Sequence, residues 1–326
     1  MREGKTPMNL AALPTRFRLT SLVTRAGDDQ SCVTTATLFH EQASLKVRWT
    51  SSRPDSRLRV HQLVSPRWKG EQPSSEDGAI FISRLVPIER PEAELNLFEL
   101  VPSGWVRDRE LVRQGRALIE ALPSGHRHLF NAIFWEGERF RRFCIGPSSM
   151  SGHHRADHGN LVHALEVAAL MRENCGRHDF MSTPVGILAG LLHDTGKADE
   201  YELGPRGDWV LSERGRLLGH RVTNIEWIAA AMAGQRIVLP DGHYQALLHC
   251  LTASQGAPEW LGIRKPAMLE ALLLSDMDRL SGRGNLIRGC RTVGQEGWGR
   301  MHPHLPTQPY VLPEAEVTAQ ARELVG

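Results

Sequence analysis

The chain has 326 residues, which is longer than most single domains and predicts two of them. Hydrophobic residues make up 41% and charged residues 23%, which is typical of a globular protein, and no apolar run reaches the roughly 18 residues of a membrane span. We find no secretion signal at the N-terminus and therefore expect a cytoplasmic protein without membrane contacts. The five cysteines form no Cys-x-x-Cys pair, which argues against a zinc ribbon, a redox motif and a disulfide framework.

Positive charge is concentrated near the N-terminus. Residues 1–70 contain 12 Lys and Arg against 5 Asp and Glu, which leaves +7, whereas the whole chain carries only +2. A basic segment on a nearly neutral chain favours a surface that faces a polyanion such as nucleic acid. A solvated basic face without a partner would have the same composition.

The N-terminal segment has the pattern of a small β-barrel. Short runs rich in Val, Thr, Leu and Ile predict strands at 19–23, 33–38, 43–49, 58–64 and 80–86. Turn-like residues separate these runs, so we predict an OB-like antiparallel barrel over residues 1–90. An SH3-like barrel would give a similar pattern.

Beyond residue 90 the apolar spacing becomes helical. We predict a helical linker at 91–146, a helical bundle domain at 147–285 and a C-terminal extension at 286–326. The predicted helices lie at 160–173, 184–193, 217–233, 243–253, 265–280 and, in the extension, 313–324. The predicted fold class is therefore α+β, an OB-like barrel followed by an all-α domain.

Histidines gather in the helical part, where nine of the fifteen lie between residues 153 and 249. His193 and Asp194 follow an apolar helical run and precede a turn that ends at Lys197. At a helix end two adjacent side chains can converge on one ion, and we expect Gly196 to close the helix. Taken alone, each histidine is better interpreted as a hydrogen-bonded core residue.

Two further candidate ligands lie on other predicted helices. His163 is on an earlier helix, and Asp278 is on the apolar stripe of a later one. A buried carboxylate is costly without a cation, so Asp278 needs either a metal ion or an arginine such as Arg279 or Arg283. The neighbouring histidines favour a metal ion.

His220 and His249 follow apolar residues on two separate predicted helices. With Asp194 as a bridge, they would hold a second ion, an arrangement that suits phosphodiester hydrolysis. Mixed histidine and carboxylate ligands favour Mn, Fe, Co, Ni or Zn over Ca. We therefore expect one or two divalent ions, with Mn as the first choice.

Four motifs occur in a fixed order along the helical part. Residues 153–163 match H-H-x-x-x-G-G-L-x-x-H, with His158 replacing the first glycine and Asn160 the leucine. The other three are L-H-D-x-x-K at 192–197, directly after Leu191, L-L-G-H at 217–220 and an aspartate motif at 278–280. These motifs resemble those of HD-superfamily metal-dependent phosphohydrolases, and more closely those of YhaM-like 3'-to-5' exoribonucleases, which join an OB-fold to an HD domain.

The resemblance implies a role for each matching residue. The metal ligands would be His163, His193, Asp194 and Asp278, with His220 serving a second ion. Lys197 would lie near a substrate phosphate; the alternative is an ordinary solvated lysine after a helix end. We assign Asp194 and Lys197 as catalytic, and His153, His154 and Arg155 as substrate contacts. Where the family carries two successive histidines, this chain has Ser254 and Gln255, which leaves only His249 upstream.

The resemblance also implies an activity, the stepwise hydrolysis of single-stranded RNA or DNA from the 3' end, and it is compatible with a homo-oligomer. The barrel would guide the strand. Its predicted phosphate contacts are Arg16, Arg18, Arg48, Arg53, Arg57, Arg59, Arg67 and Lys69. Of the two candidate stacking residues, we expect Trp49 to be buried and Trp68 to be on the surface.

Three other functions fit parts of the pattern. Conjugative relaxases of the MobH type have a similar HD domain and process DNA, but they would cut one defined strand. A nucleotide phosphohydrolase would use the same centre without the barrel. A degenerate HD module would bind single strands without cutting them, which the Ser254-Gln255 departure would favour.

Overall fold

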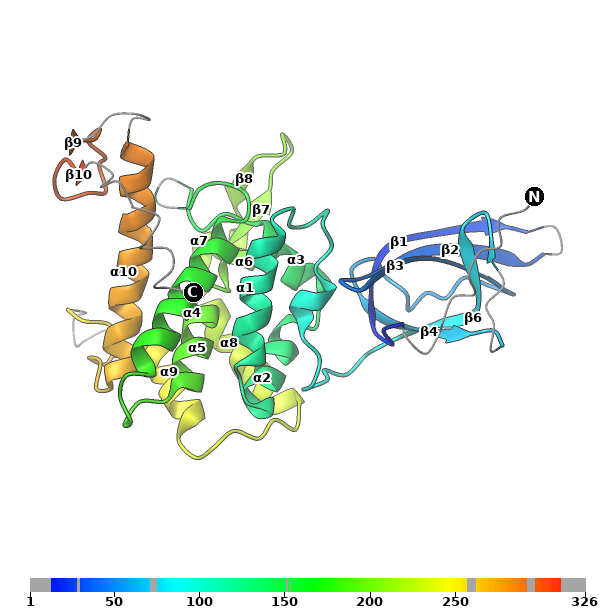
Figure 1. Cartoon of the computed structure of the whole chain (residues 1–326), viewed down its shortest axis with the longest axis horizontal. Helices are drawn as coiled ribbons and strands as arrows, with labels where there is room; N and C mark the ends of the chain where they lie inside the picture. Colours follow the sequence, from blue (N-terminus) through cyan, green and yellow to red (C-terminus); the bar gives the residue numbers. More distant parts are fainter. Residues whose placement is uncertain are drawn as a thin grey trace, which may run out of the picture.

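The computed structural model describes residues 13–27, 30–70, 75–150, 152, 154–256, 262–291 and 297–311. A β-barrel lies at one end of the molecule and a larger helical body at the other, joined by the segment after strand β6 (Figure 1). This arrangement agrees with the predicted α+β class. The predicted helix at 313–324 falls outside the described residues.

The barrel is a closed, OB-like sheet. Its strands are β1 (Phe17–Ala26), β2 (Cys32–His40), β3 (Ala43–Ser51), β4 (Leu63–Trp68), β5 (Ser75–Glu76) and β6 (Ala79–Pro87). They pair in the order β3-β2-β1-β4-β6-β5, and a parallel pairing of β3 with β6 closes the sheet. Alternate residues of each strand point inward, as Leu45, Val47 and Trp49 do in β3, so the barrel has its own apolar core.

The fourth strand lies further along the chain than predicted. Leu58 is buried but lies in the segment before the strand, and β4 begins only at Leu63. The predicted strand ended at residue 64, two residues before Pro66, which cannot donate a hydrogen bond to a sheet. The pairing of β4 with β1 ends at Val64, so Pro66 lies where that side of the strand has no partner. Proline is tolerated at such an edge position.

The helical body is built around one apolar core. Its helices are α1 (Arg109–Glu120), α2 (Ser124–Phe134), α3 (Gly137–Ile145), α4 (Gly159–Cys175), α5 (Thr183–Leu192), α6 (Lys197–Glu200), α7 (Glu213–Leu217), α8 (Gly219–Gly234), α9 (His243–Thr252) and α10 (Leu269–Cys290), with the 3-10 turn η2 (Leu97–Leu100). The segment expected to be a linker contains α1 to α3, and the buried side chains of these helices belong to the same core as those of α4 and α5.

Three parts of the helical body differ from the prediction. Helix α10 continues to Cys290, ten residues beyond the predicted end, because Leu286 and Cys290 are buried against Leu305 and outweigh the helix-weakening glycines between them. A hairpin of β7 (Tyr201–Leu203) and β8 (Trp209–Leu211) interrupts the helices. A short pairing of β9 (Gly297–Trp298) with β10 (Tyr310–Val311) follows α10.

Arg18 connects the barrel to the helical body. Its side chain is fully buried, and its guanidinium lies 5.1 Å from the ring centre of Trp105 and 5.6 Å from that of Phe140. Nη1 donates to the carbonyl oxygen of His61 at 2.8 Å, and burial lowers the pKa of the guanidinium to about 9. The prediction that Arg18 contacts phosphate is therefore wrong, since it binds the two parts of the protein together.

Across the described residues, every helix is too short or too polar to cross a membrane.

Candidate metal centre

His163 is held in a fixed position by the start of α4. The residue before this helix, His158, has a left-handed backbone with φ of 66°, and its Nδ1 lies 3.0 Å from the carbonyl oxygen of Cys144. The first residue of the helix, Gly159, must be glycine because a Cβ there would lie 1.9 Å from the carbonyl oxygen of His154. One turn later, the His163 side chain is fully buried.

His193 and Asp194 directly follow α5, whose residues from Val185 to Leu192 are all buried. Asn224 of α8 fixes this turn, because its Nδ2 donates to the carbonyl oxygen of His193 at 2.5 Å and its Oδ1 accepts from the backbone of Gly196. Gly196 was expected to close α5, but that helix ends at Leu192 and Gly196 has a right-handed backbone with φ of −62°. It is glycine for another reason, since a Cβ would lie 2.3 Å from the carbonyl oxygen of His220.

Three side chains from three helices meet at one point. Nε2 of His163 lies 3.1 Å from Nε2 of His193 and 3.1 Å from Oδ1 of Asp278. Nε2 of His193 lies 3.9 Å from the same carboxylate oxygen. All three donor atoms fall within 4.8 Å of one another. Asp194 approaches from the side, with Oδ2 at 3.4 Å from His163 and 3.5 Å from His193.

These donors fit a divalent transition-metal ion. Ligand atoms about 2.1 Å from one ion lie roughly 3.0 Å apart at a right angle and roughly 3.4 Å apart at a tetrahedral angle. The spacings at His163, from 3.1 to 3.4 Å, fall in that range. Two imidazole nitrogens with carboxylate oxygens suit Mn, Fe, Co, Ni or Zn. Asp278 faces these histidines, whereas Nη1 of Arg279 lies 3.8 Å from Oδ1 of Asp276, so Arg279 pairs with a different carboxylate.

The charges of the centre also favour a cation. Burial opposes the charged form of His163, but hydrogen bonds with Asp194 and Asp278 raise its pKa to about 9. Burial lowers the pKa of His193. Although burial would raise the pKa of both carboxyls, the charges of Lys197 and His193 hold that of Asp194 well down, and the His163 hydrogen bond lowers that of Asp278. In the absence of metal, a proton on His163 therefore supplies the positive charge that a metal ion would bring.

Asp194 connects this centre to a neighbouring group. Lys197 Nζ lies 2.5 Å from Asp194 Oδ2 and 3.2 Å from Ser148 Oγ. The other carboxylate oxygen, Oδ1, lies 3.4 Å from Nε2 of His220. Glu200 orients His220, with Oε2 at 2.6 Å from Nδ1. Asp194 and His220 thus face one another as a second cation site would require.

His249 does not join them. Its Nε2 accepts the backbone N–H of Ala267 at 2.9 Å, so this ring nitrogen is used in a contact outside the site. A pocket of about 290 Å³ opens beside His193, Asp194 and Asp278. Ser254 also lines this pocket.

Over less than half of its length, the chain is similar to bacterial exoribonucleases. It is 25% identical over 147 residues to the 3'-5' exoribonuclease YhaM of Bacillus licheniformis, a match that covers 45% of this chain and 46% of that protein. The identity is 24% over 152 residues to YhaM of a Geobacillus species, covering 45% of this chain and 44% of that one. YhaM of Bacillus subtilis is 24% identical over 145 residues, covering 44% and 45%. No protein-family model and no solved structure matches the chain.

The predicted substrate contacts near the centre are only partly available. His153 lies outside the described residues. His154 is 5% exposed and lies behind His163, with Nε2 at 3.3 Å from Ser281 Oγ, so it is placed to support the centre and not to meet substrate. Arg155 is exposed in the loop before α4.

Four residues of the site were missed by the sequence reasoning. Arg221 lines the pocket next to His220, and Glu200 holds His220. Glu166 and Ser281 form a pair behind His163. A signal for this pair was present, because each lies three residues after a predicted ligand, on the same face of its helix.

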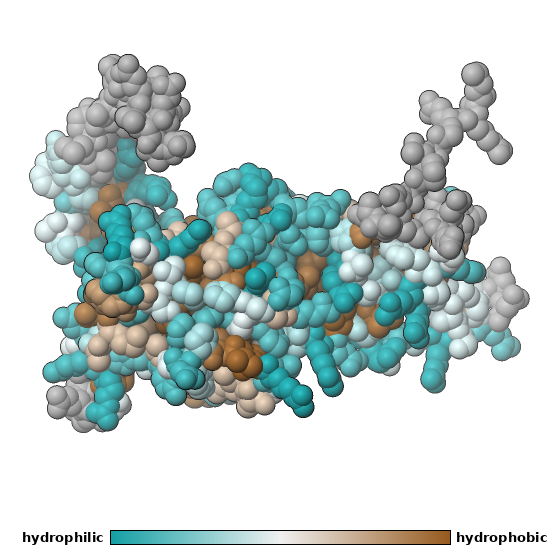
Figure 2. Space-filling view, turned by 60° about the horizontal axis from the view of Figure 1, so that its bottom comes forward, coloured by the Kyte–Doolittle hydropathy of each residue, from teal (hydrophilic) through white to brown (hydrophobic). Residues whose placement is uncertain are grey.

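On the barrel, an aromatic and basic surface lies around β3, β4 and β6. Arg48 is 6.0 Å from the ring centre of Phe81, a residue that the sequence reasoning did not single out. Arg67 and Lys69 are exposed, and Trp68 is half-buried against the barrel core. Figure 2 shows mainly hydrophilic residues on this view of the molecule, with hydrophobic residues in small separate patches.

The other predicted contacts on the barrel differ in burial and pairing. Trp49 is only 5% exposed and belongs to the barrel core. Arg16 and Arg57 form ion pairs with Glu92 and Asp55. Arg53 and Arg59 are exposed.

Proposed function

We propose that this chain is a metal-dependent nuclease that hydrolyses single-stranded RNA, or DNA, from the 3' end. The observation that carries the proposal is the convergence of His163, His193 and Asp278, whose donor atoms lie within 4.8 Å of one another. The RNA substrate and the 3'-to-5' direction are supported by the names of the YhaM relatives.

Each residue of the centre has a distinct task in this proposal. His163, His193 and Asp278 hold one divalent ion, and Asp194 can bridge toward a second ion at His220. When bound, such an ion polarises the phosphoryl oxygens and lowers the pKa of a water ligand toward neutrality. Lys197 lines the pocket and places a positive charge where a phosphate would enter.

The remaining pocket residues act on the substrate. Arg221 adds a second positive charge at the wall of the pocket, which suits a phosphodiester. The barrel supplies Phe81 and Arg48 as a stacking and phosphate-binding surface for the preceding nucleotides. Binding of a longer strand would then depend on both parts of the molecule.

Labelled oligonucleotides test this proposal directly. The purified chain is incubated with 5'-labelled single-stranded RNA and DNA, with Mn²⁺ or with chelator. We expect a ladder of shortening products with Mn²⁺, no products with chelator, and loss of the ladder in the His193→Ala variant. His178→Ala changes an exposed histidine in the loop after α4 and is the matched control. A single defined cut, or cleavage that persists in chelator, would contradict the proposal.

The size of the pocket favours one alternative, a nucleotide phosphohydrolase. A pocket of about 290 Å³ is at the small end of ligand sites and suits a single nucleotide. It fits the terminal residue of a strand and also a free nucleotide. Cleavage of free nucleotides with little dependence on salt, and no activity on oligonucleotides, would favour this alternative.

A further inference from the structure

A hydrogen-bonded relay lies directly behind His163, on the side away from the metal centre. Nδ1 of His163 is 3.0 Å from Oγ of Ser281, and this hydroxyl donates to Oε2 of Glu166 at 2.6 Å. Nε2 of His154 lies 3.3 Å from the same Oγ and 3.4 Å from the same carboxylate oxygen. Ser281 is 6% exposed, so this contact is protected from water.

The direction of these bonds follows from the chemistry of the groups. An ionised carboxylate only accepts hydrogen bonds, so the single hydroxyl proton of Ser281 is given to Glu166. The oxygen of Ser281 then accepts from Nδ1–H of His163. That tautomer leaves Nε2 as the nitrogen that can carry a lone pair toward Asp278 and His193.

The tautomer of His193 is fixed in the same way, but by a single hydrogen bond. Nδ1 of His193 lies 2.8 Å from the carbonyl oxygen of Gly190, which can only accept, so Nδ1 must donate. His193 is thus oriented by its own helix. His163, in contrast, depends on two side chains from α4 and α10.

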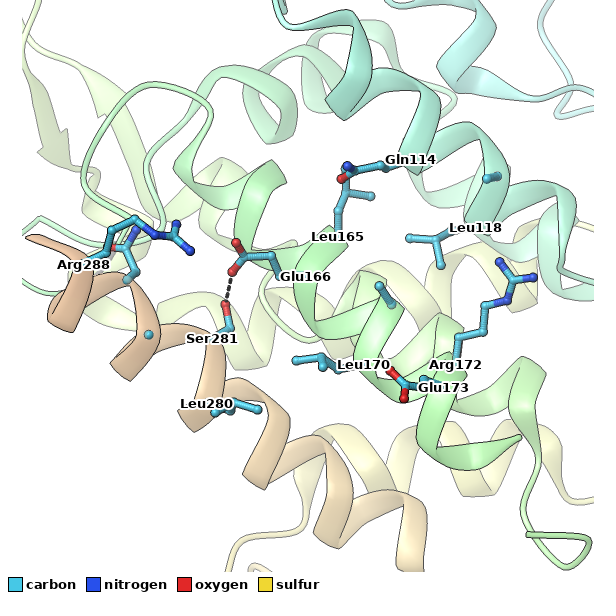
Figure 3. Close-up of a pocket in the computed structure, with 14 residues that line it drawn as sticks. Gln114, Leu118, Leu165, Glu166, Leu170, Arg172, Glu173, Leu280, Ser281 and Arg288 are labelled. Atoms are coloured by element: carbon cyan, nitrogen blue, oxygen red, sulfur yellow. Dashed lines mark hydrogen bonds between the residues drawn. The ribbon is translucent and has the colours of Figure 1, made fainter. Parts of the chain in front are cut away.

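Glu166 is reached from a different side of the protein than the metal centre. It lines a pocket of about 880 Å³ between α1, α4 and α10, and its side chain is 38% exposed there. Figure 3 shows Glu166 beside Leu165 on α4, with its hydrogen bond to Ser281 on α10. This pocket shares no lining residue with the 290 Å³ pocket beside His193 and Asp194.

We propose that Ser281 and Glu166 are positioning residues that fix the Nδ1–H tautomer of His163 and thereby set the affinity of the centre for its metal ion. This inference rests on the proposed function, because it assumes that His163 binds metal. Partners of this kind behind a metal-bound histidine typically change metal affinity about 10- to 100-fold. Neither residue touches the substrate in this account.

Metal titration of the full chain tests the relay. Ser281→Ala and Glu166→Ala are compared with the wild type by calorimetric titration with Mn²⁺. We expect each variant to raise the Kd for Mn²⁺ by about 10-fold or more, and excess Mn²⁺ to restore kcat. Glu173→Ala is the matched control, because Glu173 is on the same helix, lines the same pocket and is exposed, and its Kd should equal that of the wild type.

Two further readouts separate positioning from a structural role. The melting temperature of the metal-free Ser281→Ala and Glu166→Ala proteins should stay close to that of the wild type. In the zinc-loaded, ¹⁵N-histidine-labelled wild type, NMR should show His163 protonated at Nδ1 and bound through Nε2, and Ser281→Ala should weaken or lose the protected Nδ1–H signal. A wild-type Kd in both variants would overturn the relay alone, as would lost activity that excess Mn²⁺ does not restore. Failure of the wild type to bind Mn²⁺ or Zn²⁺ would overturn the proposed function as well.

Discussion

Two pairs of histidines in the helical body have similar distances between their rings, but the pKa is shifted in opposite directions in His163 and His126. Nε2 of His163 is 3.1 Å from Nε2 of His193, and Nε2 of His126 is 2.9 Å from Nδ1 of His243. Carboxylates surround the first pair, and the pKa of His163 rises to about 9. Burial dominates at the second pair, and the pKa of His126 falls to about 4. The carboxylates of Asp194 and Asp278 therefore distinguish the candidate metal centre from a pair of imidazoles that are merely close together.

Removal of a carboxylate should have the largest effect. Asp278→Asn keeps the shape of the side chain but removes its negative charge. We therefore expect the affinity for Mn²⁺ to fall by more than about 100-fold, which is more than the loss of a residue that only hydrogen-bonds to a ligand would cause. Nuclease activity should fall with it. Calorimetric titration with Mn²⁺ measures the affinity.

His243→Ala is the matched variant in the second pair, and its Mn²⁺ affinity should equal that of the wild type. The contrast between the two pairs would be broken if His243→Ala lost Mn²⁺ binding while Asp278→Asn kept it.

Metal affinity should depend strongly on pH. Below about pH 9 an entering ion must displace the proton of His163. The apparent affinity for Mn²⁺ should therefore rise about 10-fold per pH unit from pH 6.5 toward 9, with release of about one proton. Titrations in buffers of different ionisation enthalpy measure both quantities. An affinity that is constant over this range would show that His163 is not a ligand.

The two pairs should change stability with pH in opposite directions. His126 has a folded-state pKa below that of an unfolded histidine, so the free energy of unfolding should fall as pH drops from 6.5 to about 4, by up to about 1.4 kcal/mol per unit. His163 has a raised pKa, so its contribution is present below pH 6.5 and is lost as pH rises to about 9.

Urea unfolding at a series of pH values measures both effects. His126→Leu should reduce the acid-side loss and leave the alkaline side unchanged, and saturating Mn²⁺ should remove the alkaline-side loss. If His126→Leu instead altered the alkaline side, the assignment of the two pairs would be reversed.

The smallest effect is expected at His220. His220→Ala removes the group that faces Asp194 Oδ1 at 3.4 Å but leaves the three central donors, so we expect activity to fall by several-fold with the tighter Mn²⁺ site retained. His249→Ala should change neither, because His249 Nε2 contacts the backbone of Ala267. Steady-state rates at a series of Mn²⁺ concentrations distinguish them. Equal losses in the two variants would place His249 in the site after all.

The sequence predicted the centre better than its surroundings. His163, His193 and Asp278 could be found because metal binding demands particular side chains, and each lies at a recognisable place on an apolar helix. His249 satisfies the same criteria, but the loop that leads into α10 takes its Nε2. Which of two similar histidines joins the cluster is decided by tertiary contacts, and these were not visible in the spacing.

In the fold, too, the local sequence pattern predicted some elements well and others poorly. Barrel strands with clear alternation, such as β2 and β3, lie close to their predicted positions. The prediction failed at residues whose local preference is overridden by packing, such as Pro66 at an open strand edge and the glycines of α10. Arg18 was assigned to the surface because arginine is usually exposed, whereas the rings of Trp105 and Phe140 bury it.

Anomalous diffraction from a crystal of the full chain soaked in Mn²⁺ tests the central claim most directly. The account predicts a peak about 2.0 to 2.3 Å from Nε2 of His163, Nε2 of His193 and a carboxylate oxygen of Asp278. A soaked crystal with no peak at these atoms, or with its peak between His126 and His243, would contradict it.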